Sequence, residues 1–319
     1  MNTVSIVMYH YIRDLTHSRY PGIKALDLSL FRQQLDFLQS RYTVIRCEDV
    51  LAAINGEKKI DKPACVLTFD DGYLDHYTNV FPLLRERGIT GFFSMPGKII
   101  KENKLLDVNK IHFLLAAKPI ELLLPMIYER LDHYRGSEYP IPPMKELYNK
   151  LAISNRFDSA DVIFVKRLLQ VELEETLRGK IVDDLFASII GLPETTFAHE
   201  LYMSIDQVRL MAREGMEWGI HGYDHYWMNR LEESALQQDV TQALDVFDGV
   251  TNRNGWICVY PYGSTSESVI NVVKEMGAIG GLGTEVGPCP LSRQVLYSMP
   301  RFDTNDFPPK SENYRCFLE

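Results

Sequence analysis

The sequence predicts an α/β protein built on a closed or nearly closed barrel of parallel strands and interrupted by a helical insertion. Short apolar runs alternate with amphipathic stretches, and several of these stretches end in a glycine directly before the next apolar run. A glycine past a helix end adopts the left-handed conformation that other residues resist. Short buried strands that alternate with helices indicate a parallel sheet, and seven or so such units favour a barrel over an open sheet.

The expected strands and helices of the barrel follow one another along the chain. Residues 28–40 read as a helix with Phe31, Leu35 and Leu38 on one face. Ser204 and Gln207 form a capping box that opens another helix, which Gly215 ends. The other expected helices cover 81–87 and 266–276, and the expected strands cover 4–8, 43–45, 65–69, 89–94, 216–220, 256–259, 278–284 and the short run 295–299.

Residues 104–201 break the alternation, because they are rich in helical patterns and carry no obvious strand. Helices are expected over 121–134, 144–155 and 161–177, with three prolines between the first two. We interpret this segment as a helical insertion within a single domain that spans residues 1–319. A length of 319 residues also fits two domains.

Composition and charge exclude several classes of protein. Apolar residues make up 45% of the chain and charged residues 24%, which is typical of a globular protein and not of a disordered or fibrous one. A total of 34 Lys and Arg against 43 Asp and Glu leaves a net charge of −9. The chain therefore lacks the basic surface that nucleic acid or an anionic membrane requires.

The sequence also predicts a compartment. Its five cysteines form no C-x-x-C pair, which favours reduced thiols. The N-terminal apolar stretch is short and has no early Lys or Arg, so it does not match a signal peptide. No apolar stretch approaches the ~20 residues that span a bilayer. We therefore expect a cytoplasmic protein without a transmembrane segment; a chain trimmed of a leader or anchor is the alternative.

Residues capable of chemistry follow the predicted strands directly. They are His10, the pair Asp70-Asp71, the pair His221 and His225, the segment around Tyr262, and Arg301. In an α/β barrel the carboxyl ends of the strands meet on one face, where such enzymes keep their active sites. We therefore expect these residues to converge.

Two of these groups together predict a metal site. Adjacent carboxylates repel each other, and a cation that takes one and leaves the other as a base would explain Asp70 and Asp71; a solvated turn is the alternative. Two histidines spaced by four share one face if a helix starts there, although they are also compatible with surface or capping roles. One Asp and two His complete a three-ligand set with an open position, as in catalytic zinc sites.

The same residues resemble the motifs of a known family. Thr68–Tyr73 and His221–His225 resemble the first and second motifs of polysaccharide deacetylases (carbohydrate esterase family 4, the NodB homology domain), and Val259–Gly263 resembles the third. The branch that contains poly-N-acetylglucosamine deacetylases is similar at Met8–His10, Phe31–Leu38 and Phe81–Leu84. The likeness covers about 3–100 and 202–305 and leaves the insertion out.

This resemblance implies a distorted (β/α)7 barrel and assigns roles to the site residues. Asp70 would be the general base. Asp71, His221 and His225 would be the ligands of a divalent ion, with Zn²⁺ as first choice. The backbone N–H of Tyr262 would help to hold the oxyanion.

The chain departs from the family at two points. Cys258 and Val259 occupy the place of the usual arginine of the third motif, and the usual late Leu-x-His motif is absent. In the similar branch an early histidine supplies the general acid, which would be His10 here. Arg301 is the candidate to replace the missing arginine beside Asp70.

The expected function is metal-dependent removal of an N-acetyl or other acyl group from a sugar during surface polysaccharide biosynthesis. The substrate would be an acylated sugar, a nucleotide-linked or lipid-linked glycan, or a polysaccharide. One alternative is a deformylase of an N-formyl sugar or another non-peptide amidohydrolase. Another is an Fe(II) oxygen-activating site, although such a site needs no neighbouring carboxylate base like Asp70. The third is a non-catalytic sugar-binding protein on a decayed deacetylase scaffold.

Overall fold

The computed structural model describes residues 2–136, 138–155 and 158–317, and the chain forms two compact units. The first, which we call the barrel unit, comprises Met1–Asp14, Ala25–Asn103 and His199–Glu319. The second, the helical unit, comprises Leu15–Lys24 and Lys104–Ala198. We predicted a single domain with a helical insertion over 104–201, which leaves residues 15–24 with the barrel. The single-domain organisation stays a prediction.

A nine-stranded sheet forms the centre of the barrel unit over the described residues. Its main strands are parallel neighbours in chain order: β1 (Thr3–Tyr9), β5 (Ala64–Phe69), β6 (Phe92–Met95), β7 (Glu217–Ile220), β8 (Trp256–Val259) and β9 (Ala278–Leu282). Two short strands extend it, β4 (Thr43–Val44) beside β5 and β10 (Cys289–Pro290) antiparallel to β1. Strands β2 (Ile12–Arg13) and β3 (Leu26–Asp27) form a separate parallel pair.

The chain after β9 joins the two ends of this sheet. Met299 forms a parallel bridge with Leu282 of β9, and β11 (Phe302–Asp303) pairs in parallel with β1. The sheet therefore curls into a distorted barrel, and the predicted α/β barrel fold is confirmed. The strand expected over 295–299 is wrong in position, because 293–295 form a 3-10 turn and the paired strand comes later. As a result, Arg301 lies at the seam of the barrel.

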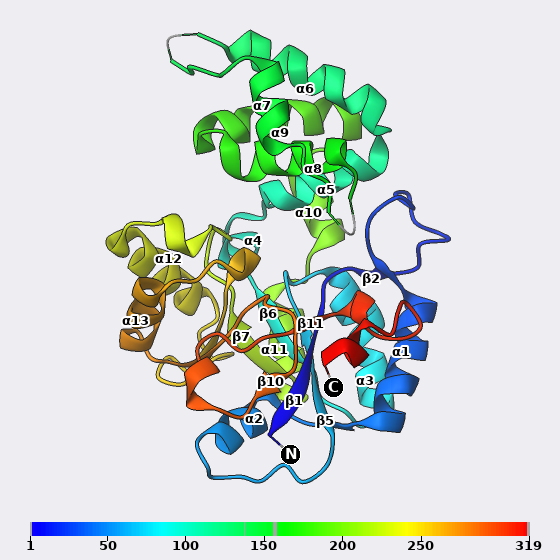
Figure 1. Ribbon diagram of the computed structural model, residues 1–319, viewed down its shortest axis with the longest axis vertical. Coiled ribbons are helices and arrows are strands. Elements are labelled where there is room, and N and C mark those ends of the chain that lie inside the picture. The colour runs from blue at the N-terminus through cyan, green and yellow to red at the C-terminus, as the bar shows by residue number, and fades with distance from the viewer. Residues whose placement is uncertain (1, 137, 156–157, 318–319) are drawn as a thin grey trace. The chain divides into compact units, whose positions relative to one another are not determined.

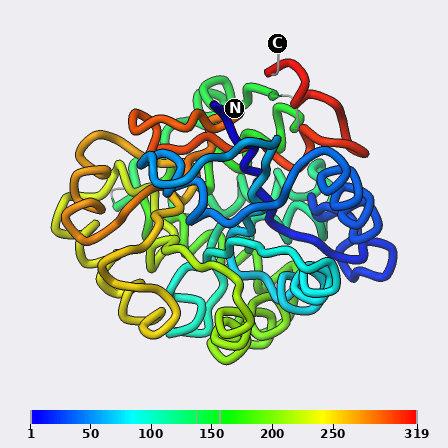
Figure 2. The backbone as a smooth tube through the Cα atoms, turned by 90° about the horizontal axis from the view of Figure 1, so that it is seen from below, coloured from blue at the N-terminus to red at the C-terminus, as the bar shows by residue number. Residues whose placement is uncertain are grey.

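Helices surround the strands in chain order, as the tube view of the barrel unit shows (Figure 2). The outer helices are α1 (Leu28–Arg41), α3 (Phe81–Glu86), α11 (Ile205–Arg213), α12 (Glu233–Val246) and α13 (Glu267–Glu275). The expected face of α1 is buried through Phe31, Leu35 and Leu38. The expected capping box opens α11, with Ser204 and Gln207 bonded reciprocally. Two further helices were not predicted: α2 (Cys47–Ile54) and α4 (Gly97–Glu102).

Helix α2 lies at the amino ends of the strands, beside the lower end of β1 in Figure 1. Its residues Val50, Leu51 and Ile54 share one buried apolar cluster with Ile6 of β1 and Val259 of β8. Fully burying an aliphatic side chain of this size contributes about 1.5–3 kcal/mol. This end of the barrel is therefore filled by packing, and chemistry is left to the carboxyl ends of the strands.

The helical unit has an apolar core of its own, built from leucine, isoleucine, valine and phenylalanine side chains. Its helices are α5 (Asp107–Ala117), α6 (Ile120–Tyr134), α7 (Met144–Leu151), α8 (Ala160–Arg167), a π-helical turn (Leu168–Glu172), α9 (Glu175–Ile190) and the start of α10 (Glu194–Leu201). The single helix expected over 161–177 is wrong. The chain breaks after the π-turn, where the Glu174 carboxylate accepts the amides of Thr176 and Leu177 and caps α9.

Within the described residues, no helix is both long enough and apolar enough to cross a bilayer.

Candidate active site

The predicted site residues meet at the carboxyl ends of the strands. Asp70 and Asp71 follow β5, and His221 follows β7. The side chains of Asp70, Asp71, His221, His225 and Arg301 are all buried. A cluster of buried ionisable groups is unfavourable unless its members are paired with opposite charges or bind an ion. These side chains therefore need ion-pair partners or a bound ion.

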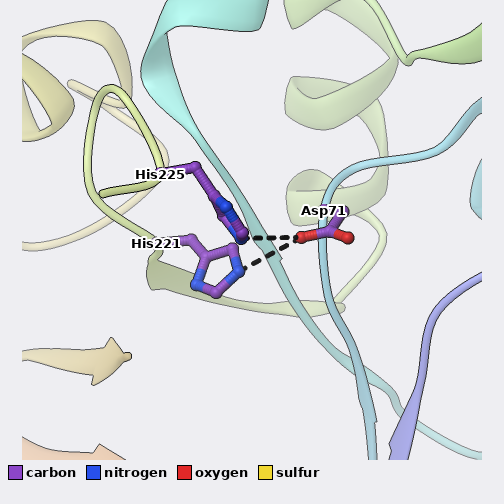
Figure 3. Close-up of side chains that lie close together, drawn as sticks. All are labelled: Asp71, His221 and His225. Atoms are coloured by element: carbon purple, nitrogen blue, oxygen red, sulfur yellow. Dashed lines mark hydrogen bonds and ion pairs between the residues drawn. The ribbon is translucent and has the colours of Figure 1, made fainter. Parts of the chain in front are cut away.

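Asp71, His221 and His225 point toward one common position (Figure 3). Nε2 of His221 lies 3.2 Å and Nε2 of His225 lies 3.4 Å from Oδ1 of Asp71. Charge-assisted hydrogen bonds are shorter, about 2.7–2.9 Å. A tetrahedral Zn²⁺ with bonds of about 2.0–2.2 Å would separate neighbouring ligand atoms by about 3.4 Å. The three residues therefore fit a divalent ion in both donor type and spacing.

Neighbouring groups orient two of these three ligands. His221 Nδ1 lies 2.7 Å from the carbonyl oxygen of Val259, which accepts its proton and leaves Nε2 as the free lone pair. The Tyr73 hydroxyl donates to Oδ2 of Asp71 at 2.6 Å and leaves Oδ1 toward the histidines. Partners of this kind fix ligand orientation in metal sites.

The spacing of the two histidines works through a loop and not through a helix, contrary to the expectation. Residues 221–227 have no helical structure, and His225 has a φ of 61°. Asp71 and Tyr262 also have positive φ values, 73° and 58°. A non-glycine residue in this region costs on the order of 1–3 kcal/mol and persists only where the surrounding structure enforces it. Backbone strain is thus concentrated at the predicted ligands and oxyanion donor.

Asp70 is held apart from the ligand set by Arg301 and Ser94. Arg301 Nη1 lies 2.8 Å from Oδ2 of Asp70, and the Ser94 hydroxyl donates to Oδ1 at 3.0 Å. Arg301 also donates to Thr68 Oγ1 and to the carbonyl oxygen of Gly283. Burial raises the pKa of Asp70, but the positive charge of Arg301 is the largest opposing effect, and this pKa falls below its ordinary value. Asp70 is therefore an ionised carboxylate.

Asp71 is ionised for a different reason. Burial raises its pKa, but the adjacent imidazoles of His221 and His225 outweigh this effect and hold the pKa well below the ordinary value. One anionic oxygen and two imidazole nitrogens form a donor set typical of catalytic Zn²⁺.

His10 follows β1 and is partly buried. Strand β1 pairs with β5 in a register that places Tyr9 beside Phe69, so His10 and Asp70 directly follow neighbouring strands at the same edge of the sheet. His76 is fully buried, and its Nε2–H donates to the carbonyl oxygen of His10 at 2.8 Å. Burial lowers the pKa of His76 to about 4, so it supports His10 as a neutral ring.

Tyr262 lies in a 3-10 turn, Pro261–Gly263, directly after β8. Its ring stacks on Trp227 with centroids 4.6 Å apart and meets the ring of His225 edge-on at the same distance. Cys258 and Val259, which replace the arginine of the resembling family, are fully buried in β8. The guanidinium beside Asp70 is supplied instead by Arg301 from the barrel seam.

Four contributing residues had no role assigned from the sequence, namely Thr68, Tyr73, Ser94 and Asp239. Thr68 and Ser94 interrupt apolar strand runs, and this polarity at buried positions was a usable signal. Tyr73 directly follows Asp71-Gly72. Asp239 lies on α12 and accepts backbone amides of the loop that joins the two histidines, a contact that no sequence pattern reveals.

Sequence comparison relates the chain to known proteins over part of its length. A family model described as polysaccharide deacetylase matches residues 57–127 and 190–279. Poly-beta-1,6-N-acetyl-D-glucosamine N-deacetylase of Escherichia coli (strain K12) is 32% identical over 81 residues, 25% of this chain and 12% of that protein. YxkH of Bacillus subtilis (strain 168), named after the same family, is 24% identical over 106 residues, 33% of this chain and 38% of YxkH. The chain thus matches well under half the length of either relative.

Solved structures share the fold. The Streptococcus pyogenes deacetylase PplD, solved in complex with acetate, aligns with a TM-score of 0.60 at 16% identity and covers 99% of this chain and 98% of its own. IcaB from Ammonifex degensii aligns with a TM-score of 0.56 at 16% identity and covers 97% and 95%. The family model covers about half of the chain, and its matched segments contain both aspartates and both histidines of the site. The chain therefore belongs to the polysaccharide deacetylase family.

Proposed function

We propose that this protein is a metal-dependent hydrolase that removes an N-acetyl group, or another small acyl group, from a sugar. One observation carries the proposal. Three ligand atoms of Asp71, His221 and His225 converge beside a second, ionised carboxylate, Asp70, which Arg301 holds outside the ligand set. Ligands and base are thus separate groups in the same buried site.

Asp71, His221 and His225 would hold a divalent ion, with Zn²⁺ the first choice for this donor set. Such an ion, when bound, polarises an acyl carbonyl and lowers the pKa of water toward ~7. The protein supplies two nitrogens and one oxygen, so a four-coordinate ion held by them would keep one position for water or substrate.

The protein's own residues carry the proton transfers. Asp70 accepts the proton of the attacking water, since its low pKa keeps it ionised at neutral pH. The Tyr262 N–H donates to the developing oxyanion, and such donors are most effective in a buried site. His10 donates a proton to the leaving nitrogen. The products are an amino sugar and a small carboxylic acid.

The substrate we propose is an N-acetylglucosamine-containing glycan. The E. coli relative is named for poly-beta-1,6-N-acetyl-D-glucosamine, and the stacked pair Trp227 and Tyr262 lies beside His225. Aromatic rings of this kind offer flat apolar faces to a sugar ring. A nucleotide-linked or lipid-linked precursor, a role in surface polysaccharide biosynthesis and a cytoplasmic location belong to the same proposal.

The test is release of acid from defined sugars by the Zn²⁺-loaded protein. Oligomers of β-1,6-linked N-acetylglucosamine, UDP-N-acetylglucosamine and an N-formyl sugar would be incubated with it, and free acetate and formate would be measured by NMR. We expect acetate from an N-acetyl sugar, loss of activity with a chelator, and recovery with Zn²⁺. Formate alone would favour a deformylase. Bound metal with neither product would favour a sugar-binding protein.

A further inference from the structure

The loop from His221 to His225 is held by two different helices. At the start of α4, the amides of Gly97 and Lys98 donate to the carbonyl oxygens of Gly222 and Tyr223 at 3.1 and 3.0 Å. On the other side, α12 presents a carboxylate to the same loop. Asp239 Oδ2 accepts the Tyr223 amide at 3.0 Å, and Oδ1 accepts the Asp224 amide at 2.9 Å.

Asp239 is an unusual residue for this position. It is only 5% exposed and lies on the apolar face of α12 with Leu236, Val240 and Ala243. The nearby cation Lys98 pairs with Asp224, and Asp239 forms no ion pair in the described part of the chain. A buried anion is costly unless its oxygens are hydrogen-bonded. Both carboxylate oxygens of Asp239 accept amides of the loop, so the hydrogen bonds that offset its burial are the ones that hold the loop.

The loop needs such a constraint because its backbone is strained. Gly222 has a φ of 69° and His225 a φ of 61°. A Cβ at Gly222 would lie 2.7 Å from Asp239 Oδ2, so the carboxylate sits directly against the backbone. A left-handed histidine persists only where the surroundings over-determine it. The four hydrogen bonds from α4 and α12 supply that constraint immediately before His225.

We propose that Asp239 is a positioning residue for the metal site: its carboxylate fixes the 221–225 loop so that His225 faces Asp71. This inference rests on the metal site of the proposed function. Partners that orient ligands typically contribute 10–100-fold to metal affinity. The loop is therefore set before the ion arrives.

The first test compares Asp239→Asn with the wild-type protein in metal binding. Asparagine has the same size but only one acceptor oxygen, so one of the two loop amides loses its partner. Asp245→Asn is the matched control, because Asp245 is on the same helix, is exposed, and pairs with Arg253 and not with the loop. Zn²⁺ affinity would be measured by competition with a chromophoric chelator, and the coordination geometry by the visible spectrum of the Co²⁺-loaded protein.

We expect Asp239→Asn to weaken Zn²⁺ binding by about 10–100-fold and to change the Co²⁺ spectrum, while Asp245→Asn matches the wild type. A purely structural role would lower the melting temperature of the metal-free protein and leave affinity and spectrum of the folded protein unchanged. That result, or wild-type Zn²⁺ affinity in Asp239→Asn, would overturn this inference and leave the proposed metal site standing. A wild-type protein that binds no Zn²⁺ would overturn the proposed metal site and this inference with it.

A second measurement needs no variant and decides the matter if Asp239→Asn does not fold. Hydrogen exchange of the Tyr223 and Asp224 amides would be followed in the metal-free wild-type protein. Slow exchange, comparable to that of the amides of β7, is expected because Asp239 already holds both groups. Fast exchange that becomes slow only with Zn²⁺ would show that the ion orders the loop, and the inference would be wrong.

Discussion

Arg301 and Asp70 form a buried ion pair across the seam of the barrel, with Nη1 of the arginine 2.8 Å from Oδ2 of the aspartate and side-chain exposures of 1% and 3%. The two residues are far apart in sequence, and the pair forms because the chain after β9 returns to β1. Removing one partner of a buried pair leaves an uncompensated charge. The pair therefore links barrel closure to the protonation state of the candidate base.

The first prediction concerns the pH profile of Arg301→Met. The positive charge of Arg301 lowers the pKa of Asp70 against the effect of burial, so its loss raises that pKa. The Asp70 carboxylate then takes up its proton at a higher pH, and the acid limb of the kcat/KM profile moves to higher pH. Arg301→Lys keeps the charge and should move it less. We also expect Arg301→Met to lose about 3–5 kcal/mol of stability, measured by denaturant unfolding. If folded Arg301→Met kept the acid limb of its kcat/KM profile at the wild-type pH, Arg301 would not be what lowers the pKa of Asp70.

The second prediction separates the metal ligands from the rest of the site. Asp71→Ala, His221→Ala and His225→Ala should each lose most bound Zn²⁺ and activity, because each removes one of three donors. Elemental analysis after dialysis measures the metal, and circular dichroism checks the fold. His76→Gln is a control, since His76 is buried nearby but contacts the His10 carbonyl and not the donor set. Full Zn²⁺ occupancy in His221→Ala would refute the ligand assignment.

The third prediction concerns Asp70→Asn. The amide is nearly isosteric and keeps a hydrogen-bonding oxygen, but it cannot accept the proton of water at neutral pH. We expect Zn²⁺ content close to that of the wild type and turnover reduced by about 10²–10⁴-fold. Activity within a few-fold of the wild type would show that Asp70 is not the base.

The positions of Asp70, Asp71, His221 and His225 could be predicted from the sequence because of one property of the fold. The carboxyl ends of parallel strands meet on one face, so residues that directly follow strands converge whatever their separation along the chain. Arg301 was predicted from the same pattern, but in the structure it lies between the bridge of Met299 to β9 and the start of β11, and not after a regular strand.

Contacts that depend on backbone groups could not be predicted in this way. Asp239 acts on the amides of Tyr223 and Asp224, and amides are identical in every residue. Glu174 likewise breaks a helix by accepting amides of the following turn, although the apolar pattern continues through it. The segment Leu15–Lys24 belongs to the helical unit because Tyr20 packs against Phe113 and Phe197, a tertiary contact that overrides sequence order.

The last prediction concerns His10 as general acid. Expulsion of an amine from a tetrahedral intermediate needs a proton donor, and the usual late histidine of the family is absent here. His76 is unsuited, because burial lowers its pKa to about 4 and its Nε2–H is committed to the His10 carbonyl. Histidine is the most common general acid in enzymes, and His10 directly follows β1, the parallel neighbour of the strand β5 that precedes both aspartates.

His10→Ala should therefore lower the rate on an N-acetyl sugar by about 10²–10⁴-fold. The rate on an activated ester such as a nitrophenyl acetate should fall much less, because its leaving group departs without a proton. Zn²⁺ content should stay at the wild-type level, which separates loss of the acid from damage to the donor set. Equal losses on amide and ester would indicate a defect in attack and not in departure. Unchanged rates on both substrates would assign the proton to another group and leave His10 as the strand-end residue that His76 anchors.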